Sequence, residues 1–346
     1  WVEKDGVKTQ EGNLFTFDIS NPTQKQLVNE WTGSITVDPT INNSCDTVVY
    51  VKTVDNAGNE RTESAALDID VTAPTIRITY DDTANVNAEE GYFTSRTATV
   101  VITERIHHFD ADAATNGITI NAVDANGKAI ENAYTISDWT TAEGKTADAA
   151  THTATIKFNK DANYTFAISY TDNADNKNTE PDVTGQTVPY EFTVDTTKPT
   201  GSVTVEANTW DKLLEVLTFG LYKNSTAKVS ATADDDTSPV VIEYYKTSNA
   251  TVMTEKELDA VTDWTAFENS ALEQNGVSPD EQFVVYLKIT DYAGNYIYIN
   301  SDGYIVEKSE SKIVLTPEEA NEKGIYGLEY ENGINVDVKI TDSEPY

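Results

Sequence analysis

Aspartate recurs at the start of one five-residue phrase that appears three times in the chain. The copies read Asp55-Asn56-Ala57-Gly58-Asn59, Asp172-Asn173-Ala174-Asp175-Asn176 and Asp291-Tyr292-Ala293-Gly294-Asn295. Carboxylate oxygens are the ligands that Ca²⁺ takes, about 6–8 of them, and clustered carboxylates without a cation repel one another. A local interpretation stands beside this one, because an Asp side chain also accepts backbone N–H groups of its own turn. The phrase therefore predicts a repeated corner, which is also a candidate cation ligand.

The spacing of the phrase indicates what carries it. Its first Asp recurs after 117 residues and again after 119. That period is too long for a solenoid repeat and suits a whole small domain. We expect an array of similar domains, and such arrays usually space or bind rather than catalyse.

Strands with apolar residues at every second position must hold these turns in place. Residues 164–170 and 283–289 each place apolar side chains at every second position and run directly into the phrase, and residues 295–299 continue the last copy as a second strand. The pattern predicts hairpins whose Gly58 and Gly294 take positive φ, with a slightly different turn at Asp175. Helix is scarce: residues 210–217 suggest a short helix or turn, and the capping box of Thr254 and Glu257 suggests a short helix over 254–260.

A second phrase marks the domain boundaries. It reads Ile69-Asp70-Val71-Thr72-Ala73-Pro74, then Val194-Asp195-Thr196-Thr197-Lys198-Pro199, with a weaker copy at Val306-Glu307-Lys308-Ser309. Proline stiffens these joints. We expect complete domains at 73–198 and 199–308, the later strands of a truncated domain at 1–72, and the opening strands of another at 309–346. The alternative is that the two end pieces are small domains of their own.

Composition restricts the partners. The chain has 346 residues, 58 acidic against 24 basic residues, and a formal net charge of −34. Such a charge argues against nucleic acid and anionic membranes and suits solubility or divalent cations. Cys45 is the single cysteine, so no disulfide forms within the chain, and no run is long enough for a membrane span. Because the chain does not begin with Met, we interpret it as an internal fragment, and we expect a monomer.

The phrases and strands together resemble a known family. Many short strands in units of about 110–125 residues fit antiparallel β-sandwiches. The Asp-x-Ala-Gly-Asn phrase followed by Val-Asp-x-Thr-x-Pro resembles the bacterial immunoglobulin-like repeats of cell-surface and adhesin-type proteins. Residues 199–308 carry most of the likeness, in Trp210, 218–222, 241–245, Trp264, 284–291 and 299–303. The resemblance implies an all-β, elongated array of tandem immunoglobulin-like sandwiches.

In such a sandwich the last hairpin turn lies at the same end as the N-terminus and as the loop after the second strand. Acidic segments distant in sequence would then meet at each junction, where calcium could stiffen the joint. The stronger candidate ligands are Asp195, Asp234, Asp235, Asp236 and Asp291; the weaker are Asp70, Glu104 and Asp172. In the alternative interpretation each Asp only caps its own turn. No cofactor is required in either case.

Catalytic patterns are missing from the sequence. His107, His108 and His152 have no zinc-binding spacing, and we expect the first two in a loop near one end of a sandwich. No nucleophile motif appears, and acidic pairs arise by chance among so many carboxylates. We therefore expect a protein that is not an enzyme.

The aromatic residues support two interpretations. A planar row on one sheet face would stack on sugars, whereas scattered rings would fill cores. The candidates are Trp31, Trp139, Trp210, Trp264, Tyr244, Tyr245, Tyr296 and Tyr298.

The sequence thus favours an extracellular, non-enzymatic stalk of a bacterial surface protein that spaces or presents a distal binding module. Its partners would be the neighbouring domains of the same chain and a host protein or glycan. The alternative is a carbohydrate-binding region of a secreted glycan-degrading enzyme. An adhesin module that binds a host protein through its loops is a third possibility.

Overall fold

A computed structural model describes residues 1–12, 32–55, 57–82, 87–144, 150–206, 208–222, 226–268, 271–275, 282–306, 312–327, 330 and 332–341. The chain forms two compact units. Unit 1 is Trp1–Thr197 with Asp236–Ser238 and Tyr292–Gly294, and unit 2 is Lys198–Asp235, Pro239–Asp291 and Asn295–Tyr346. The expected division into four parts stays a prediction.

Unit 1 begins with a four-stranded antiparallel sheet in the order β2-β1-β3-β4. Its strands are β1 (Val2–Lys4), β2 (Val7–Gln10), β3 (Ser44–Val54) and β4 (Glu60–Ile69). The first copy of the Asp phrase joins β3 to β4, so the predicted hairpin is confirmed here.

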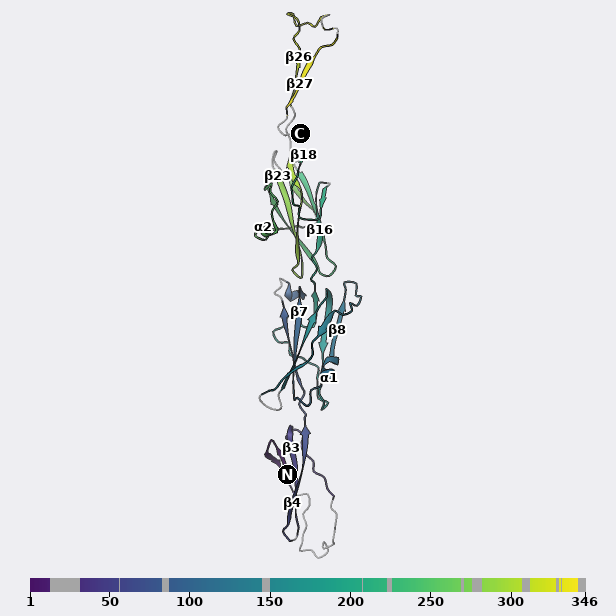
Figure 1. The fold of residues 1–346 in the computed structure, drawn as a ribbon, viewed down its shortest axis with the longest axis vertical. Coiled ribbons are helices and arrows are strands. Elements are labelled where there is room, and N and C mark those ends of the chain that lie inside the picture. The colour runs from purple at the N-terminus through teal and green to yellow at the C-terminus, as the bar shows by residue number, and fades with distance from the viewer. Residues whose placement is uncertain are drawn as a thin grey trace. The chain divides into compact units, whose positions relative to one another are not determined.

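The rest of unit 1 is a β-sandwich, the first sandwich (Figure 1). One layer has the order β10-β11-β7-β5 with β9 also on β11, and the other the order β6-β15-β12-β8. Its elements are β5 (Thr75–Asp82), η2 (Ala88–Glu90), β6 (Tyr92–Phe93), β7 (Arg96–Glu104), α1 (Ala111–Asn116), β8 (Ile118–Val123), β9 (Tyr134–Ile136), β10 (Thr140–Ala142), β11 (Ala150–Phe158), β12 (Ala162–Ile168), β13 (Tyr170–Thr171), β14 (Lys177–Asn178) and β15 (Glu191–Val194).

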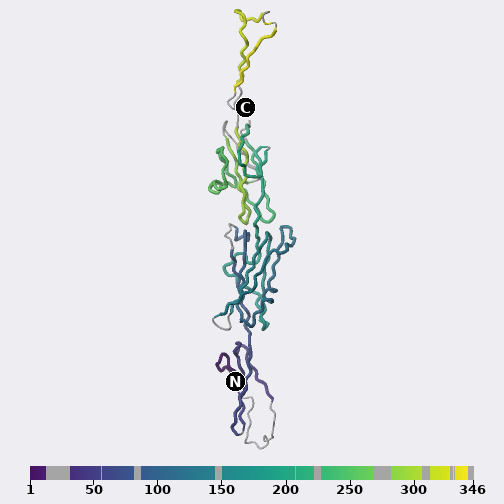
Figure 2. The backbone as a smooth tube through the Cα atoms, in the orientation of Figure 1, coloured from purple at the N-terminus to yellow at the C-terminus, as the bar shows by residue number. Residues whose placement is uncertain are grey.

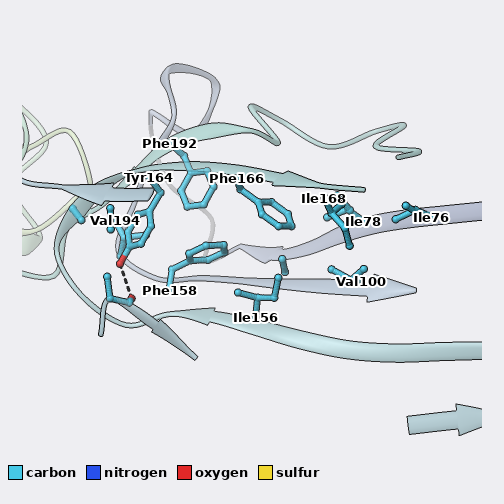
Figure 3. Packing of buried hydrophobic residues seen from close by; sticks show 14 of the residues in the cluster. Ile76, Ile78, Val100, Ile156, Phe158, Tyr164, Phe166, Ile168, Phe192 and Val194 are labelled. Atoms are coloured by element: carbon cyan, nitrogen blue, oxygen red, sulfur yellow. Dashed lines mark hydrogen bonds between the residues drawn. The ribbon is translucent and has the colours of Figure 1, made fainter. Parts of the chain in front are cut away.

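Side chains from both layers form one apolar core. Figure 3 shows Ile78 and Val100 from one layer and Phe166 and Phe192 from the other lying between the strands. Strand β12 buries Tyr164, Phe166 and Ile168 and exposes the residues between them, as its alternation predicted.

Unit 2 contains the second sandwich, the teal-to-green stretch of the tube in Figure 2. One layer has the order β17-β16-β19-β22 and the other the order β18-β25-β23-β20-β21, with β24 also on β23. Its elements are β16 (Thr200–Val205), β17 (Asn208–Trp210), β18 (Phe219–Tyr222), β19 (Thr226–Asp234), β20 (Val240–Thr247), α2 (Glu255–Asp259), β21 (Thr265–Ala266), β22 (Ala271–Asn275), β23 (Gln282–Asp291), β24 (Tyr296–Asn300) and β25 (Gly303–Val306).

The two sandwiches share a strand order. In each, the first long strand (β5 or β16) pairs with the second (β7 or β19), and the second pairs with a later strand (β11 or β22), while the opposite layer holds two further long strands (β8 and β12, or β20 and β23) and the final strand. A short strand near the start, β6 or β18, then runs parallel to the final strand, β15 or β25. This is the order of immunoglobulin-like sandwiches, so the chain carries tandem domains of that fold class.

The segments expected to be helical behave differently from one another. Residues 211–217 form bends and irregular backbone. Helix α2 forms with the full capping box, since Thr254 accepts from the Glu257 amide and Glu257 accepts from the Thr254 amide. The short helix α1, capped by Asp110, was not expected.

Unit 2 ends in a two-stranded antiparallel hairpin of β26 (Lys312–Pro317) and β27 (Val336–Thr341), with exposed strands. No helix among the described residues has the length and apolar character needed to cross a membrane.

Candidate functional site

The three Asp phrases form the same hydrogen-bonded turn. In the first two copies, Oδ1 of the Asp accepts the amides two and four residues later at 2.8–2.9 Å. In the third, Asp291 Oδ1 accepts the Asn295 amide at 2.9 Å. In all three, Oδ2 accepts the side-chain amide of the closing Asn at 2.7–3.0 Å. One residue of the first copy, Asn56, lies outside the described residues.

The expectation of a different turn at Asp175 was wrong. Asp175 has φ 67°, beside 85° at Gly58 and 98° at Gly294, and its amide bonds back to the Asp172 carbonyl as the Gly58 amide does to Asp55. Asp can adopt this left-handed backbone conformation more readily than most residues, because its short polar side chain can form local hydrogen bonds.

The same turn occurs at two further places that sequence reasoning missed. Asp124 accepts the amides of Asn126 and Lys128, and Asn321 accepts those of Lys323 and Ile325. In both, a glycine with positive φ stands at the fourth position. A neutral Asn can thus replace the Asp as acceptor, so the hydrogen bonds of the turn do not require a charged side chain.

A charged cluster lies at one end of the first sandwich. Asp70 follows β4, Glu104 ends β7, and His108 lies in the turn before α1; a side-chain atom from each lies within 4.8 Å of the other two. His108 Nδ1 is 2.5 Å from Asp70 Oδ2, and its Nε2 is 2.8 Å from Asp68 Oδ2. The expected loop position of His108 is confirmed.

Arg105 holds the same segment. Its Nη1 donates to the Ile69 carbonyl and its Nη2 to Asn43 Oδ1, each at 2.8 Å. The guanidinium is also 3.7 Å from Asp68 and 3.9 Å from Asp70. We call Asp68, Asp70, Glu104, Arg105 and His108 the clasp, because they fasten the end of β4 to the sandwich.

Burial and like charges set the electrostatics of the clasp. Burial first, and then the charges of Asp70 and Asp172, raise the pKa of Glu104 to about 7, although the Arg105 amide donates to it. Burial lowers the pKa of His108, but the hydrogen bonds and charges of Asp68 and Asp70 outweigh it, so the net shift is upward. His152 differs: burial lowers its pKa, and its ring stacks on Phe109 at 3.7 Å.

The weaker calcium set is therefore partly assembled. Asp70 and Glu104 lie together, and Asp172 is close enough to act on Glu104 electrostatically while it caps its own turn. The Asp70 carboxylate, however, already lies 2.5 Å from the His108 ring and 3.9 Å from the Arg105 guanidinium. We assign none of the three as a metal ligand, and calcium there stays a sequence prediction.

The stronger calcium set is divided between the two units. Asp195 follows β15 and is buried, where it accepts the Thr197 amide at 3.0 Å. Asp234 ends β19, Asp235 and Asp236 follow it, and Asp291 ends β23 and is buried. Calcium at this set also stays a prediction.

The aromatic candidates do not form a planar row where the structure describes them. In unit 2 the Trp264 and Tyr298 rings stack, but Tyr245 is tilted by 58° to Trp264 and Tyr296 lies at 66° to Tyr298. Tyr298 is buried, and among the candidates that the structure describes only Tyr296 is exposed, at 38%. Trp139, Trp210 and Tyr244 pack against the cores, and Trp31 lies outside the described residues.

Sequence reasoning missed Arg105 as a partner of the clasp. The signal was the pair Glu104-Arg105, which follows the alternating buried apolar residues Ala98, Val100 and Ile102. Only the carboxylate of that pair was expected to take part in a site.

Comparison with known proteins adds little. No family model matches the chain, and no curated protein matches it. Among solved structures, one match is to domains A168–A170 of titin, at 10% identity over 80% of this chain and 78% of that chain, with a TM-score of 0.27. That similarity carries no argument, so the fold class rests on the strand order described above.

Proposed function

We propose that this chain is a non-catalytic, load-bearing spacer from an extracellular bacterial surface protein. It would separate a distal binding module from the surface that anchors it. The tandem sandwiches, the strongly acidic composition and the lack of a catalytic motif in the sequence support the proposal.

The observation that carries the proposal is the parallel pairing of the short early strand with the last strand in both sandwiches. Strand β6 pairs with β15 through Tyr92 and Phe93, with amides of Thr193 and Asp195 donating to Gly91 and Phe93 at 2.7 and 2.9 Å. Strand β18 pairs with β25 over four residue pairs.

The parallel pairing determines how the hydrogen bonds between these strands respond to a pulling force. When a sandwich is pulled from its two chain ends, the neighbouring parallel strands slide along each other. Their hydrogen bonds are then loaded together instead of opening one after another, and forced unfolding depends on the unfolding rate. A spacer under tension needs that kinetic resistance.

Single-molecule force spectroscopy on the whole chain tests the proposal. Each sandwich should unfold in one step that releases about 40 nm of chain, at ~3.4 Å per residue. Thr193→Pro removes the amide that bonds Gly91 and should lower the unfolding force of the first sandwich only. Thr193→Ala keeps that amide and is the matched control.

Two results would contradict the proposal: unfolding at forces no higher than those of a β-hairpin pulled open from one end, or equal effects of the two variants. The surface location is tested separately, by immunolabelling of intact cells of the source organism. Labelling only after permeabilisation would refute an extracellular spacer.

A further inference from the structure

The clasp joins two elements of unit 1 through side chains that are mostly buried. Asp68 lies near the end of β4 and Asp70 follows it, while Glu104, Arg105 and His108 come from the end of β7 and the turn after it. Glu104 is 6% exposed and Arg105 and His108 are also buried, so solvent screens these three groups little, whereas the Asp68 side chain is 46% exposed.

The geometry of His108 fixes its charge state in the fastened clasp. Both ring nitrogens face carboxylate oxygens, Nδ1 at 2.5 Å from Asp70 and Nε2 at 2.8 Å from Asp68. A neutral imidazole has one N–H donor and one lone pair, and the lone pair would then face a carboxylate. Only the imidazolium, with two N–H donors, satisfies both contacts.

We propose that the clasp is a proton-operated fastening, in which charged His108 holds Asp68 and Asp70 against the first sandwich and loss of its proton loosens them. The inference does not depend on the proposed function. It assigns a pH-sensitive joint to unit 1 whatever the chain carries.

The charges around His108 come from four elements. Asp68 lies in β4 and Asp70 just after it, Glu104 ends β7 and Arg105 follows it, and Asp172 lies in the turn after β13. Asp110, at the start of α1, and Tyr170, whose hydroxyl contacts the His108 carbonyl, complete the set. Carboxylates outnumber cations here, so each proton lost adds uncompensated negative charge.

The two shifted groups act in the same direction. The pKa of His108 is raised in the folded chain, so its contribution is complete below the ordinary histidine value and disappears as pH rises through the raised one. The pKa of Glu104 is raised to about 7, so its contribution is complete below its ordinary value and is lost as pH rises through about 7. The clasp should therefore contribute most to the stability of unit 1 in mild acid and least in alkali.

The test compares two neighbouring histidines in the whole chain. Thermal unfolding of unit 1 is followed from pH 5.5 to 9 for the wild type, for His108→Gln and for His107→Gln. His107 is exposed in the same turn and is the matched control. Each unit by which the folded pKa exceeds the unfolded one should give a tenfold change in the folding equilibrium constant over this window.

The wild type and His107→Gln should lose stability as pH rises, and His108→Gln should flatten the profile. Glu104→Gln, which imitates the protonated acid, should remove the part of the loss that occurs below about pH 7. Equal profiles for the two histidine variants would overturn the proposal.

A second measurement needs no variant to fold. The three histidines of the wild type are titrated by NMR through their ring ¹⁵N shifts. His108 should titrate at a higher pH than the ordinary histidine value, and His152 at a lower pH. If His108 titrates at or below the ordinary histidine value, the clasp is not held by an imidazolium and the proposal fails.

Discussion

Strands β12 and β23 occupy the same position in the two sandwiches but are buried differently. Both precede a copy of the Asp phrase, and positions 119 residues apart correspond. In β12 only alternate residues are buried, whereas in β23 the run from Phe283 to Leu287 is buried on both faces.

The second face of β23 is covered by the chain itself. Val284 and Tyr286 pack with Leu258 of α2, with Tyr298 and with side chains of the 213–219 segment, apart from the main core. The main core takes Phe283, Val285, Leu287 and Ile289. The same strand order is therefore compatible with two kinds of outer sheet face, one exposed to solvent and one buried by loops. An alternating strand such as β12 indicates the first, and a continuous apolar run such as that of β23 indicates the second.

The largest expected effect tests that second face. Tyr286→Ala removes a fully buried ring whose hydroxyl accepts the Met253 amide at 3.0 Å, and should destabilise the second sandwich by about 3–5 kcal/mol. Ala167→Ser, at the corresponding exposed position of β12, should change stability by less than about 0.5 kcal/mol. Calorimetry of the whole chain measures both, and similar effects would abolish the contrast.

The first sandwich has a buried feature of its own around Arg96, which is 1% exposed. The guanidinium lies 3.8–4.3 Å from the centres of three rings, Tyr80, Phe93 and Phe192, and donates to the Val188 and Thr187 carbonyls. This residue anchors the segment before β15 to the core, a role that no strand periodicity shows.

Substitution of Arg96 should therefore harm the first sandwich alone. Lysine cannot present a planar fork to two carbonyls while it stacks on rings, so Arg96→Lys should cost about 2–3 kcal/mol. Arg77→Lys in the neighbouring strand, at an exposed side chain, is the control and should stay near wild type. Hydrogen exchange of β15 peptides reports the difference, and unchanged protection in Arg96→Lys would refute the anchoring role.

The Asp phrase permits a smaller comparison between a buried and an exposed copy. Asp172 is 4% exposed, and Asp172→Ala leaves the Ala174 and Asn176 amides of its partly buried turn without their acceptor, which should cost about 2 kcal/mol. Asp55 lies at an exposed turn, and Asp55→Ala should cost less. Urea unfolding of each variant tests this order, and a larger loss at Asp55 would contradict it.

Acid should affect the exposed copy in a known direction. Hydrogen bonds from the Asn59 side chain and amide lower the pKa of Asp55. Its contribution is therefore present above the ordinary Asp value and is lost as pH falls through the lowered one. Asp55→Asn should remove that acid sensitivity from the β3–β4 hairpin, as amide exchange there can show.

The sequence could predict what periodicity and turn chemistry encode. Alternation located β12 and β23, and the Asp phrase located the β3–β4 and β23–β24 hairpins. It could not assign Arg105 to Asn43 or Arg96 to the 187–188 carbonyls, because those partners are 62 and about 91 residues away and belong to no pattern. It placed Asp70, Glu104 and Asp172 at one end of a sandwich and His108 in a loop near such an end. It did not pair His108 or Arg105 with these carboxylates, because the carboxylates were considered only as metal ligands.

The smallest expected effect concerns the fourth position of the turn, where the two kinds of copy can be exchanged. A Cβ added at Gly58 would meet nothing within 4 Å, so Gly58→Asp measures only the backbone cost of φ 85°, about 1 kcal/mol. Asp175→Gly makes the reverse change and should stabilise its turn by about 0.5 kcal/mol, since glycine relieves the left-handed strain but loses more chain entropy on folding. Thermal unfolding of both variants gives the two signs. If Gly58→Asp costs nothing, the turn is as favourable to aspartate as to glycine, and the residue found at this position carries no structural meaning.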